Sequence, residues 1–107
     1  MSALLVLTNV PDRAAAERLA DALVEKHVAA CVNILAPCRS VFRWQGAVQH
    51  DEEHPVLIKT TREAYAALEA EIRAHHPYEL PEIIALPIER GLPAYLDWVA
   101  EETRREP

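Results

Sequence analysis

The sequence has very few glycines and few cysteines, with two residues of each among its 107. A loop that surrounds a phosphate with backbone N–H groups needs several glycines, so we do not expect a nucleotide fold built on such a loop. Cys31 and Cys38 are too few for a disulfide scaffold and lack zinc-site spacing, which favours reduced thiols and a cytoplasmic location. We expect Cys31 to be buried and Cys38 exposed. No nucleophile–base pair is recognisable, so we do not expect an enzyme.

Positive charge and long apolar runs are also scarce. There are 11 Lys and Arg residues against 17 Asp and Glu residues, a formal net charge of −6. Nucleic acids and anionic membranes need clustered positive charge, so neither is an expected partner, whereas an excess of carboxylates suits cations. No apolar run approaches the roughly 20 residues of a membrane span. The first residues do not resemble a signal peptide. A chain of this size has little interior, so we expect any sizeable site on a surface or between subunits.

Short apolar segments with two different periodicities make up most of the chain. Continuous apolar runs indicate strands at residues 4–8, 30–35 and 83–88. Residues 30–59 are predicted to form one long β-hairpin, with irregularities near Pro37 and Pro55. The first and last runs are apolar at consecutive positions, which predicts strands that are buried on both faces.

Apolar positions spaced three and four residues apart predict helices. Asp12 is the expected N-cap of the first helix. Its apolar side is predicted to consist of Ala16, Leu19, Ala20, Leu23, Val24 and Val28. Thr60 and Glu63 have the spacing of a capping box for a second helix, which must end by His75 or His76 because Pro77 follows. A third helix is expected over residues 94–103, with Tyr95, Leu96 and Val99 facing inward.

The order of these elements is β-α-β-β-α-β followed by a terminal helix, which predicts an α+β, ferredoxin-like fold in one domain over residues 1–107. In that arrangement both main helices pack on one face of the sheet. The other face should alternate apolar and polar residues, yet the strands are apolar at consecutive positions. Either another copy of the chain or the terminal helix covers this face. We favour another copy, because one helix is too small to cover a four-stranded sheet.

The densest group of polar side chains lies between residues 75 and 82. His75 and His76 stand beside Glu79 and Glu82, and imidazole nitrogens are ligands for Cu, Zn and Ni. Both imidazoles reach one ion only from an irregular helix end, which Pro77 provides. The alternative is a helix C-terminus that favours partial positive charge. A second polar run, residues 50–54, is either a weak cation site or a solvated part of the hairpin.

Lys59 ends an otherwise apolar strand and therefore needs a partner. Glu82, at the start of the last strand, is the candidate. The pair is either a structural ion pair, which we favour, or part of a cleft in which Lys59 contacts a ligand. Tyr78, Tyr95 and Trp98 either line such a cleft or pack an interface between subunits.

Several of these segments occur together in the order and spacing of one family. They are Cys31-Val32-Asn33, Trp44-Gln45-Gly46, Lys59-Thr60-Thr61, His76-Pro77-Tyr78-Glu79-Leu80-Pro81-Glu82-Ile83-Ile84 and Tyr95-Leu96-Asp97-Trp98. Over nearly the whole chain the sequence resembles the CutA family of divalent-cation tolerance proteins.

The resemblance implies a ferredoxin-like fold, a tight trimer in which hairpins of neighbouring subunits extend the sheets, and copper binding. In some bacterial members of the family, a Cys at the end of the first strand joins the His pair as a proposed copper ligand. The pair is present here as His75 and His76. The position of that Cys is Thr8, a poor ligand for a soft metal.

We therefore expect a cytoplasmic homotrimer that binds Cu(II) or another divalent cation and contributes to metal tolerance. His75 and His76 are the expected ligands, with Glu79 acting across a subunit boundary. The alternative is a regulatory or interaction trimer similar to PII-type signalling proteins. In that case a small ligand binds in clefts between subunits that are lined by Lys59, Tyr78, Glu82, Tyr95 and Trp98.

Overall fold

The structure is a computed structural model, and it describes residues 2–104. It is an α+β fold with one antiparallel sheet and three helices, as the sequence predicts. In chain order the elements are β1 (Ala3–Val10), α1 (Arg13–Glu25), β2 (Cys31–Ile34), β3 (Cys38–Trp44), β4 (Ala47–Thr61), α2 (Arg62–His75), β5 (Ile84–Pro87) and α3 (Pro93–Glu102). None of the helices in residues 2–104 is long and apolar enough to cross a membrane.

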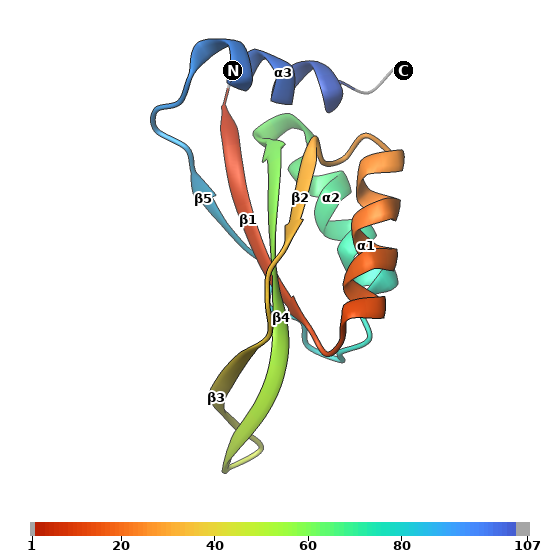
Figure 1. Cartoon of the computed structure of the whole chain (residues 1–107), viewed down its shortest axis with the longest axis vertical. Helices are drawn as coiled ribbons and strands as arrows, with labels where there is room; N and C mark the ends of the chain where they lie inside the picture. The colour runs from red at the N-terminus through yellow and green to blue at the C-terminus, as the bar shows by residue number, and fades with distance from the viewer. Residues whose placement is uncertain (1, 105–107) are drawn as a thin grey trace.

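The long strand β4 organises the sheet (Figure 1). The strand order is β2-β4-β1-β5, and β3 pairs with the first half of β4 outside this path. The second half of β4 lies between β1 and β2. We call β3 together with residues 47–53 of β4 the arm, because this two-stranded ribbon projects away from the body of the molecule (Figure 1).

The predicted irregularity near Pro37 is confirmed. Cys31 pairs with Lys59, whereas Cys38 pairs with Glu53, so one extra residue lies on the side of Pro37. An extra residue bends an antiparallel ladder, and here it separates the arm from the body. On the other strand of the hairpin the change of register falls at residues 54 and 55, near Pro55 as predicted, although β4 itself runs through this residue without a break. The carbonyl of Pro55 accepts a hydrogen bond from the Leu35 N–H at 2.9 Å, so this pairing does not require the missing N–H of proline.

Helices α1 and α2 cover one face of the sheet and form the core with it. Fully buried side chains come from these two helices and from β1 and β4: Val6, Val10, Leu19, Leu23, Val56, Ile58, Leu68 and Ile72. Each such aliphatic side chain contributes about 1.5–3 kcal/mol when it leaves water. Val24 was expected in the stripe of α1, but 43% of it is exposed, in the last turn of the helix.

The helix ends follow local hydrogen bonding. Asp12 caps α1 as predicted, and its Oδ1 accepts from the Ala15 N–H at 2.8 Å. The capping residue of α2 is Thr61, not the predicted Thr60. Thr60 points to the other face of β4 and donates its hydroxyl to the Val28 carbonyl at 2.8 Å. Side chains alternate between the two faces of a strand, which separates these neighbouring threonines. Helix α2 ends at His75, as the position of Pro77 requires.

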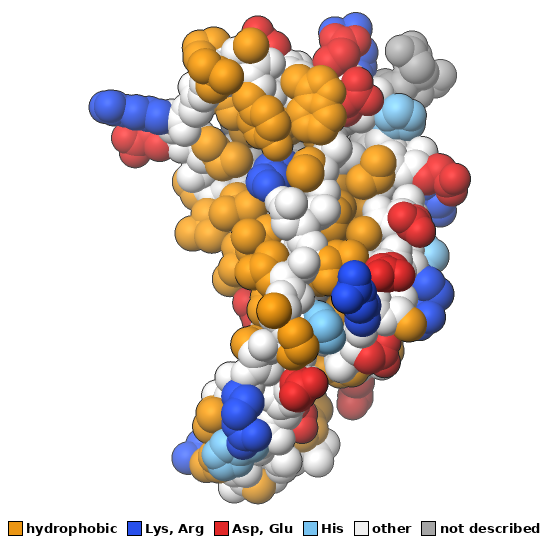
Figure 2. All heavy atoms as spheres, in the orientation of Figure 1, with side chains coloured by type: hydrophobic (Ala, Val, Ile, Leu, Met, Phe, Trp, Pro, Cys, Tyr) orange, Lys and Arg blue, Asp and Glu red, His pale blue; other side chains and the backbone are white. Residues whose placement is uncertain are grey.

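The other face of the sheet is open in the single chain. Burial alternates along β1, and Ile84 and Leu86 of β5 are each 49% exposed. The prediction of strands buried on both faces is therefore wrong for one chain. Helix α3 lies across the end of the sheet near the start of β1 and leaves this face uncovered (Figure 1). Hydrophobic side chains gather over the open face (Figure 2).

Within α3, Val99 is buried, as expected, and Leu96 is half-buried. Tyr95 was also expected to face inward, but 39% of it is exposed. The helix packs with one narrow side on the end of the sheet, so only part of its predicted apolar side reaches the core.

Candidate functional site

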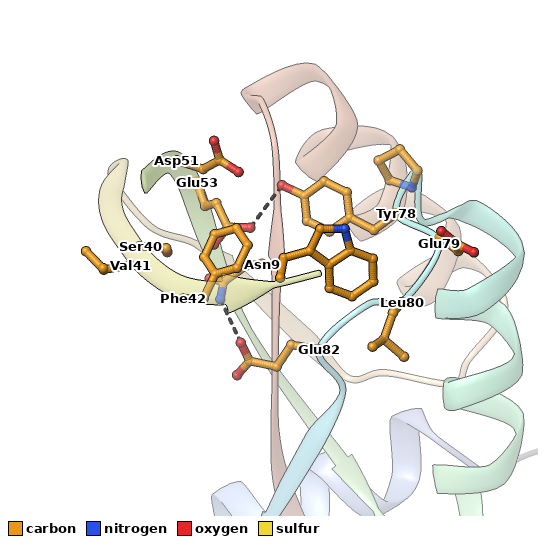
Figure 3. Close-up of a pocket in the computed structure, with 12 residues that line it drawn as sticks. Asn9, Ser40, Val41, Phe42, Asp51, Glu53, Tyr78, Glu79, Leu80 and Glu82 are labelled. Carbon is orange, nitrogen blue, oxygen red and sulfur yellow. Dashed lines mark hydrogen bonds between the residues drawn. The ribbon is translucent and has the colours of Figure 1, made fainter. Parts of the chain in front are cut away.

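A pocket of about 740 Å³ lies between the arm and the segment of residues 77–82 that follows α2. Ser40, Phe42 and Trp44 of β3 share one face of the ribbon and line the pocket, and Val41 lines it as well. Its lining consists of Asn9, Ser40, Val41, Phe42, Trp44, Asp51, Glu53, Pro77, Tyr78, Glu79, Leu80 and Glu82 (Figure 3). Aromatic and aliphatic groups form the walls, and four carboxylates stand among them, so the pocket combines apolar surface with negative charge.

Two hydrogen bonds tie the segment 77–82 to the sheet. The Tyr78 hydroxyl donates to Glu53 Oε2 at 2.9 Å, and Asn9 Nδ2 donates to Glu82 Oε1 at 2.9 Å (Figure 3). Glu53 is buried within this contact. Burial first, and then the Glu53 carboxylate, hold the pKa of Tyr78 far above its usual value of 10.0. The Tyr78 hydroxyl therefore remains a hydrogen-bond donor throughout the physiological pH range.

His76 is fixed by backbone groups on both sides of its ring. Its Nε2 lies 2.7 Å from the Asn9 carbonyl, and its Nδ1 accepts from the Tyr78 N–H at 3.2 Å. These partners define a neutral imidazole with its proton on Nε2. Burial lowers the pKa of His76, although the Asn9 carbonyl and the Glu53 charge act in the opposite direction. A metal ion can bind either nitrogen only if one of these hydrogen bonds is released.

His75 belongs to a different group of side chains. Its Nε2 lies 3.3 Å from Glu71 Oε1, and Lys26 Nζ donates to Glu71 Oε2 at 2.9 Å. The hydrogen bond from Lys26 is the main cause that lowers the pKa of Glu71, and His75 adds to it. Glu79, the third predicted ligand, lines the pocket. The structure thus gives His75, His76 and Glu79 separate surroundings.

Within residues 2–104, no group of three or more His, Cys, Asp or Glu side chains is arranged to hold a metal ion. The described residues of one chain therefore do not form a chelating site for a divalent cation. Thr8, at the position of the Cys of some family members, is 1% exposed, and its hydroxyl oxygen has no hydrogen-bond partner among the described residues. The role of His75, His76 and Glu79 as ligands stays a prediction for the assembled protein.

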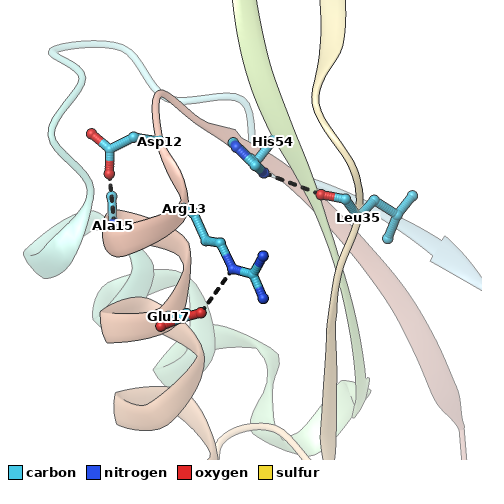
Figure 4. Close-up of polar contacts among 6 residues, drawn as sticks. All are labelled: Asp12, Arg13, Ala15, Glu17, Leu35 and His54. Atoms are coloured by element: carbon cyan, nitrogen blue, oxygen red, sulfur yellow. Dashed lines mark hydrogen bonds and ion pairs between the residues drawn. The ribbon is translucent and has the colours of Figure 1, made fainter.

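The polar run 50–54 is divided by the alternation of β4. Glu53 points into the pocket, whereas His54 Nδ1 lies 3.2 Å from the Leu35 carbonyl at the junction of arm and body (Figure 4). Asp51 also lines the pocket, and Glu52 faces Arg39 across the ribbon. The run is therefore not one cluster of ligands.

The predicted ligand cleft is divided between two places. Tyr78 and Glu82 line the pocket, but Lys59, Tyr95 and Trp98 are not among its lining residues. The predicted pair of Lys59 and Glu82 is wrong. The strand register places Lys59 opposite Leu5 and therefore level with Leu86, whereas Glu82 bonds to Asn9 further along β1.

Lys59 instead belongs to a polar cluster on the open face of the sheet. Lys59 Nζ donates to Asn33 Oδ1, and the Cys31 thiol lies 3.9 Å from the same oxygen. Burial is the main cause that raises the pKa of Tyr95, and the nearby Cys31 thiol adds to it. The ring centroids of Tyr95 and Trp98 are 5.5 Å apart. We call these five side chains the Lys59 cluster.

Sequence reasoning missed several members of both sites. Asn33 interrupts an apolar strand, which is a usable signal, but its contact with Lys59 depends on the register of β2 and β4. Phe42 and Trp44 alternate on β3 and thus share a face, but the sequence does not show that the segment 77–82 faces them. The expectation for Cys38 is confirmed, since it is exposed, whereas Cys31 is only half-buried.

Comparisons with known proteins agree on one family. The family model of the CutA1 divalent ion tolerance protein matches residues 4–102. The divalent-cation tolerance protein CutA of Thermus thermophilus is 48% identical over 99 residues, which are 92% of this chain and 96% of that protein. The chloroplastic protein CutA of Arabidopsis thaliana is 42% identical over 101 residues, which are 94% of this chain and 56% of that protein.

Solved structures show the same similarity. The crystal structure of CutA1 from Oryza sativa has a TM-score of 0.95 at 40% identity and covers 99% of this chain and 97% of that one. The Cut A1 structure from Thermus thermophilus has a TM-score of 0.93 at 47% identity, with 95% and 99% of the two chains covered.

The antiparallel sheet with helices on one face, the projecting arm and the acidic pocket at its base define the class of small α+β proteins with a hairpin arm. With the family model spanning nearly all of it, the chain belongs to the CutA1 divalent ion tolerance protein family.

Proposed function

We propose that the protein is a cytoplasmic homotrimer that binds divalent cations, Cu(II) in particular, and contributes to metal tolerance. The observation that carries this proposal is membership of the divalent ion tolerance family. The carboxylates of the pocket and the net charge of −6 support it, because both attract cations. The cytoplasmic assignment is supported by two free thiols, Cys31 and Cys38. The proposal assigns no catalytic reaction.

The trimer part of the proposal is supported by the apolar surface that one chain leaves exposed. An isolated two-stranded ribbon is at best marginally stable in water, yet the arm exposes 61% of Val41 and 54% of Val48. The open face exposes Ile84 and Leu86 as well. Contiguous apolar surface of this kind is typical of contacts between subunits. The strand order β2-β4-β1-β5 also supports the ferredoxin-like arrangement in which family trimers are built.

The distribution of charge indicates which surface the arm contacts in such an assembly. Arg39 and Arg43 of β3 are outside the pocket lining, with Glu52 opposite Arg39, while the pocket carries Asp51, Glu53, Glu79 and Glu82. An arm of one copy and a pocket of the next are complementary in charge and in apolar surface. Such a contact joins two different patches of the chain. Copies joined in this way form a closed ring if the rotation from one copy to the next adds up to a full turn.

In this assembly the cation ligands come from more than one chain. One chain offers His75 at an exposed helix end and Glu79 in the pocket, but no complete set of ligands among its described residues. His76 joins the set only if the ion replaces its hydrogen bond with Tyr78 or Asn9. The proposal therefore requires that the cation binds to the assembled trimer and not to a single chain.

A calorimetric titration with Cu(II) tests the metal function. We expect the wild type to bind the ion, and His75→Ala together with Glu79→Gln to weaken binding by about tenfold or more, because two ligands are lost. His50→Ala, which removes an imidazole from the arm, is the matched control and should bind like the wild type. Equal affinity in all three proteins removes His75 and Glu79 from the site.

The second candidate function is a regulatory or interaction trimer that binds a small ligand in clefts between subunits. The Lys59 cluster favours it, because a charged group lies there among apolar side chains beside two aromatic rings. A thermal-shift screen with metabolites and nucleotides, run beside Cu(II), separates the two functions. Stabilisation by an organic ligand but not by Cu(II) supports the second function and contradicts the first.

A further inference from the structure

The Lys59 cluster joins three elements on the open face of the sheet. Cys31 and Asn33 are on β2, Lys59 is on β4, and Tyr95 and Trp98 are on α3. Asn33 Oδ1 connects Lys59 to Cys31, and the ring of Tyr95 stands against that of Trp98. The Cys31 thiol is near enough to Tyr95 to raise its pKa. The cluster is thus one continuous group, although its members are far apart in the sequence.

Hydrogen-bond donors outnumber acceptors in this group. An ammonium has three N–H donors and no acceptor, and one bond of Lys59, to Asn33 Oδ1, is present. That oxygen is the natural acceptor of the group and is already used by Lys59 and Cys31. Within the described part of the chain, Asn33 Nδ2 and the indole N–H of Trp98 make no hydrogen bond. Unused donors around a positive charge favour an acceptor that carries negative charge.

The surroundings of Lys59 strengthen this requirement. Its lateral neighbours in the sheet are Leu5 on one side and Cys31 on the other, and Leu86 follows beyond Leu5. No carboxylate in residues 2–104 forms an ion pair with Lys59. Lys59 is half-buried, and a half-buried charge interacts with a counter-charge more strongly than a charge in open water does. An anion bound here gains more from Lys59 than it would from a lysine in open solvent.

We propose that the Lys59 cluster binds a small organic carboxylate with a flat ring. This inference rests on the second candidate function and names the class of its ligand. Lys59 Nζ and Asn33 Nδ2 donate to the two carboxylate oxygens, and the ring packs against Tyr95 and Trp98. These rings are available for it, since Tyr95 is 39% exposed and Trp98 42% exposed. One cation and one amide match a singly charged carboxylate better than a phosphate, which needs more donors.

Titration of the intact protein with benzoate, followed by calorimetry, tests this site. We expect saturable binding to the wild type, about tenfold or greater loss in Lys59→Gln, and substantial retention in Lys59→Arg, because a charge-assisted hydrogen bond is the main interaction. Tyr95→Ala should weaken binding by a smaller factor. Benzylamine, which has the same ring and the opposite charge, should not bind at the site. Far-UV circular dichroism of each variant verifies that it is folded.

Two results overturn the site: the wild type shows no saturable binding of benzoate, or the wild type and Lys59→Gln bind benzoate equally. If the wild type ignores benzoate and Lys59→Gln lowers the stability of the assembly, the partner of Lys59 is a carboxylate of another copy of the chain. A metabolite that stabilises the wild type and Lys59→Gln equally would leave the ligand-binding function intact and place its site elsewhere.

Discussion

Thr8 has a buried hydroxyl that forms no hydrogen bond with any described residue. Its hydroxyl is buried on β1 without a partner, and an unpaired buried polar group costs about 1–3 kcal/mol. We predict that Thr8→Val, which keeps the shape and removes the hydroxyl, raises the free energy of unfolding by about 1 kcal/mol. Urea denaturation measures the change.

Thr60→Val is the matched control for this prediction. Thr60 is also fully buried, but its hydroxyl donates to the Val28 carbonyl at 2.8 Å. Its replacement should lower the free energy of unfolding by about 1–2 kcal/mol, since the Val28 carbonyl loses its partner. If Thr8→Val destabilises as much as Thr60→Val, then Thr8 has a partner in solution and is not an orphan.

His76 makes stability depend on pH. Burial lowers its pKa in the folded state below the value of 6.5, so the folded protein binds its proton less readily than the unfolded chain. The contribution of neutral His76 is therefore present above pH 6.5 and is lost as the pH falls through the lowered pKa. We predict that the free energy of unfolding falls more steeply from pH 7.5 to 5.5, both about one unit from the reference value, in the wild type than in His76→Gln.

The comparison isolates His76 because the two proteins share every other titrating group. Among the neighbouring charges, Glu53 opposes the shift, and its effect is included in the wild-type curve. Parallel pH profiles for wild type and His76→Gln would contradict the assignment of a neutral, buried imidazole.

At the scale of elements, helix α1 depends on its cap. Asp12 accepts the Ala15 N–H at the start of the helix (Figure 4). We predict that Asp12→Ala lowers the free energy of unfolding by about 1 kcal/mol, the typical value for loss of an N-cap. Asp21→Ala, which removes a carboxylate from the exposed side of the same helix, should change it by less than about 0.5 kcal/mol. Thermal or urea unfolding of both variants provides the measurement.

The helices and strands were largely predictable from the sequence, but which of them pair or pack together was not. Leu19, Leu23, Leu68 and Ile72 repeat with the helical period, so the buried sides of α1 and α2 follow from local sequence. The choice of Thr61 over Thr60 as the cap depends on which face of β4 each residue occupies. That face is set by the pairing of β4 with β1, which no short segment encodes.

The same limit applies to the sites. The sequence singled out His76 and Tyr78. It did not show that the imidazole of His76 bonds to the Asn9 carbonyl or that the Tyr78 hydroxyl donates to Glu53. It offered Glu82, at the start of the last strand, as the candidate partner of Lys59, because a charge at the end of an apolar strand needs a partner. The register separates them and places Cys31 opposite Lys59, and the Lys59 side chain reaches Asn33 two residues further along β2. Contacts between distant segments are therefore the part that only the three-dimensional structure supplies.

At the scale of the whole molecule, the arm is the feature that most requires a second chain. It exposes Val41 and Val48, and its tip turns at Gln45 and Gly46, which both have positive φ. We predict that Val41→Glu reduces the mass of the assembly, because a charge enters an apolar contact between copies. Gln45→Glu adds the same charge at the tip and should leave the mass unchanged. Size-exclusion chromatography with light scattering distinguishes the two.

The pocket connects the arm to the metal function. Its carboxylates lie at the base of the arm, where a neighbouring chain is proposed to dock. If assembly completes the cation site, then Val41→Glu should also weaken Cu(II) binding, although it removes no ligand. Binding by Val41→Glu at wild-type strength in a dissociated protein would show that a single chain is sufficient.

The central claim is a trimer that holds a divalent cation with ligands from more than one chain. Native mass spectrometry of the wild type with and without Cu(II) tests it most directly. The account predicts a species of three 12.0 kDa chains that gains copper, and a His75→Ala/Glu79→Gln double variant of the same mass that does not. A single 12.0 kDa chain that binds copper, or a trimer whose copper content the double variant leaves unchanged, would contradict it.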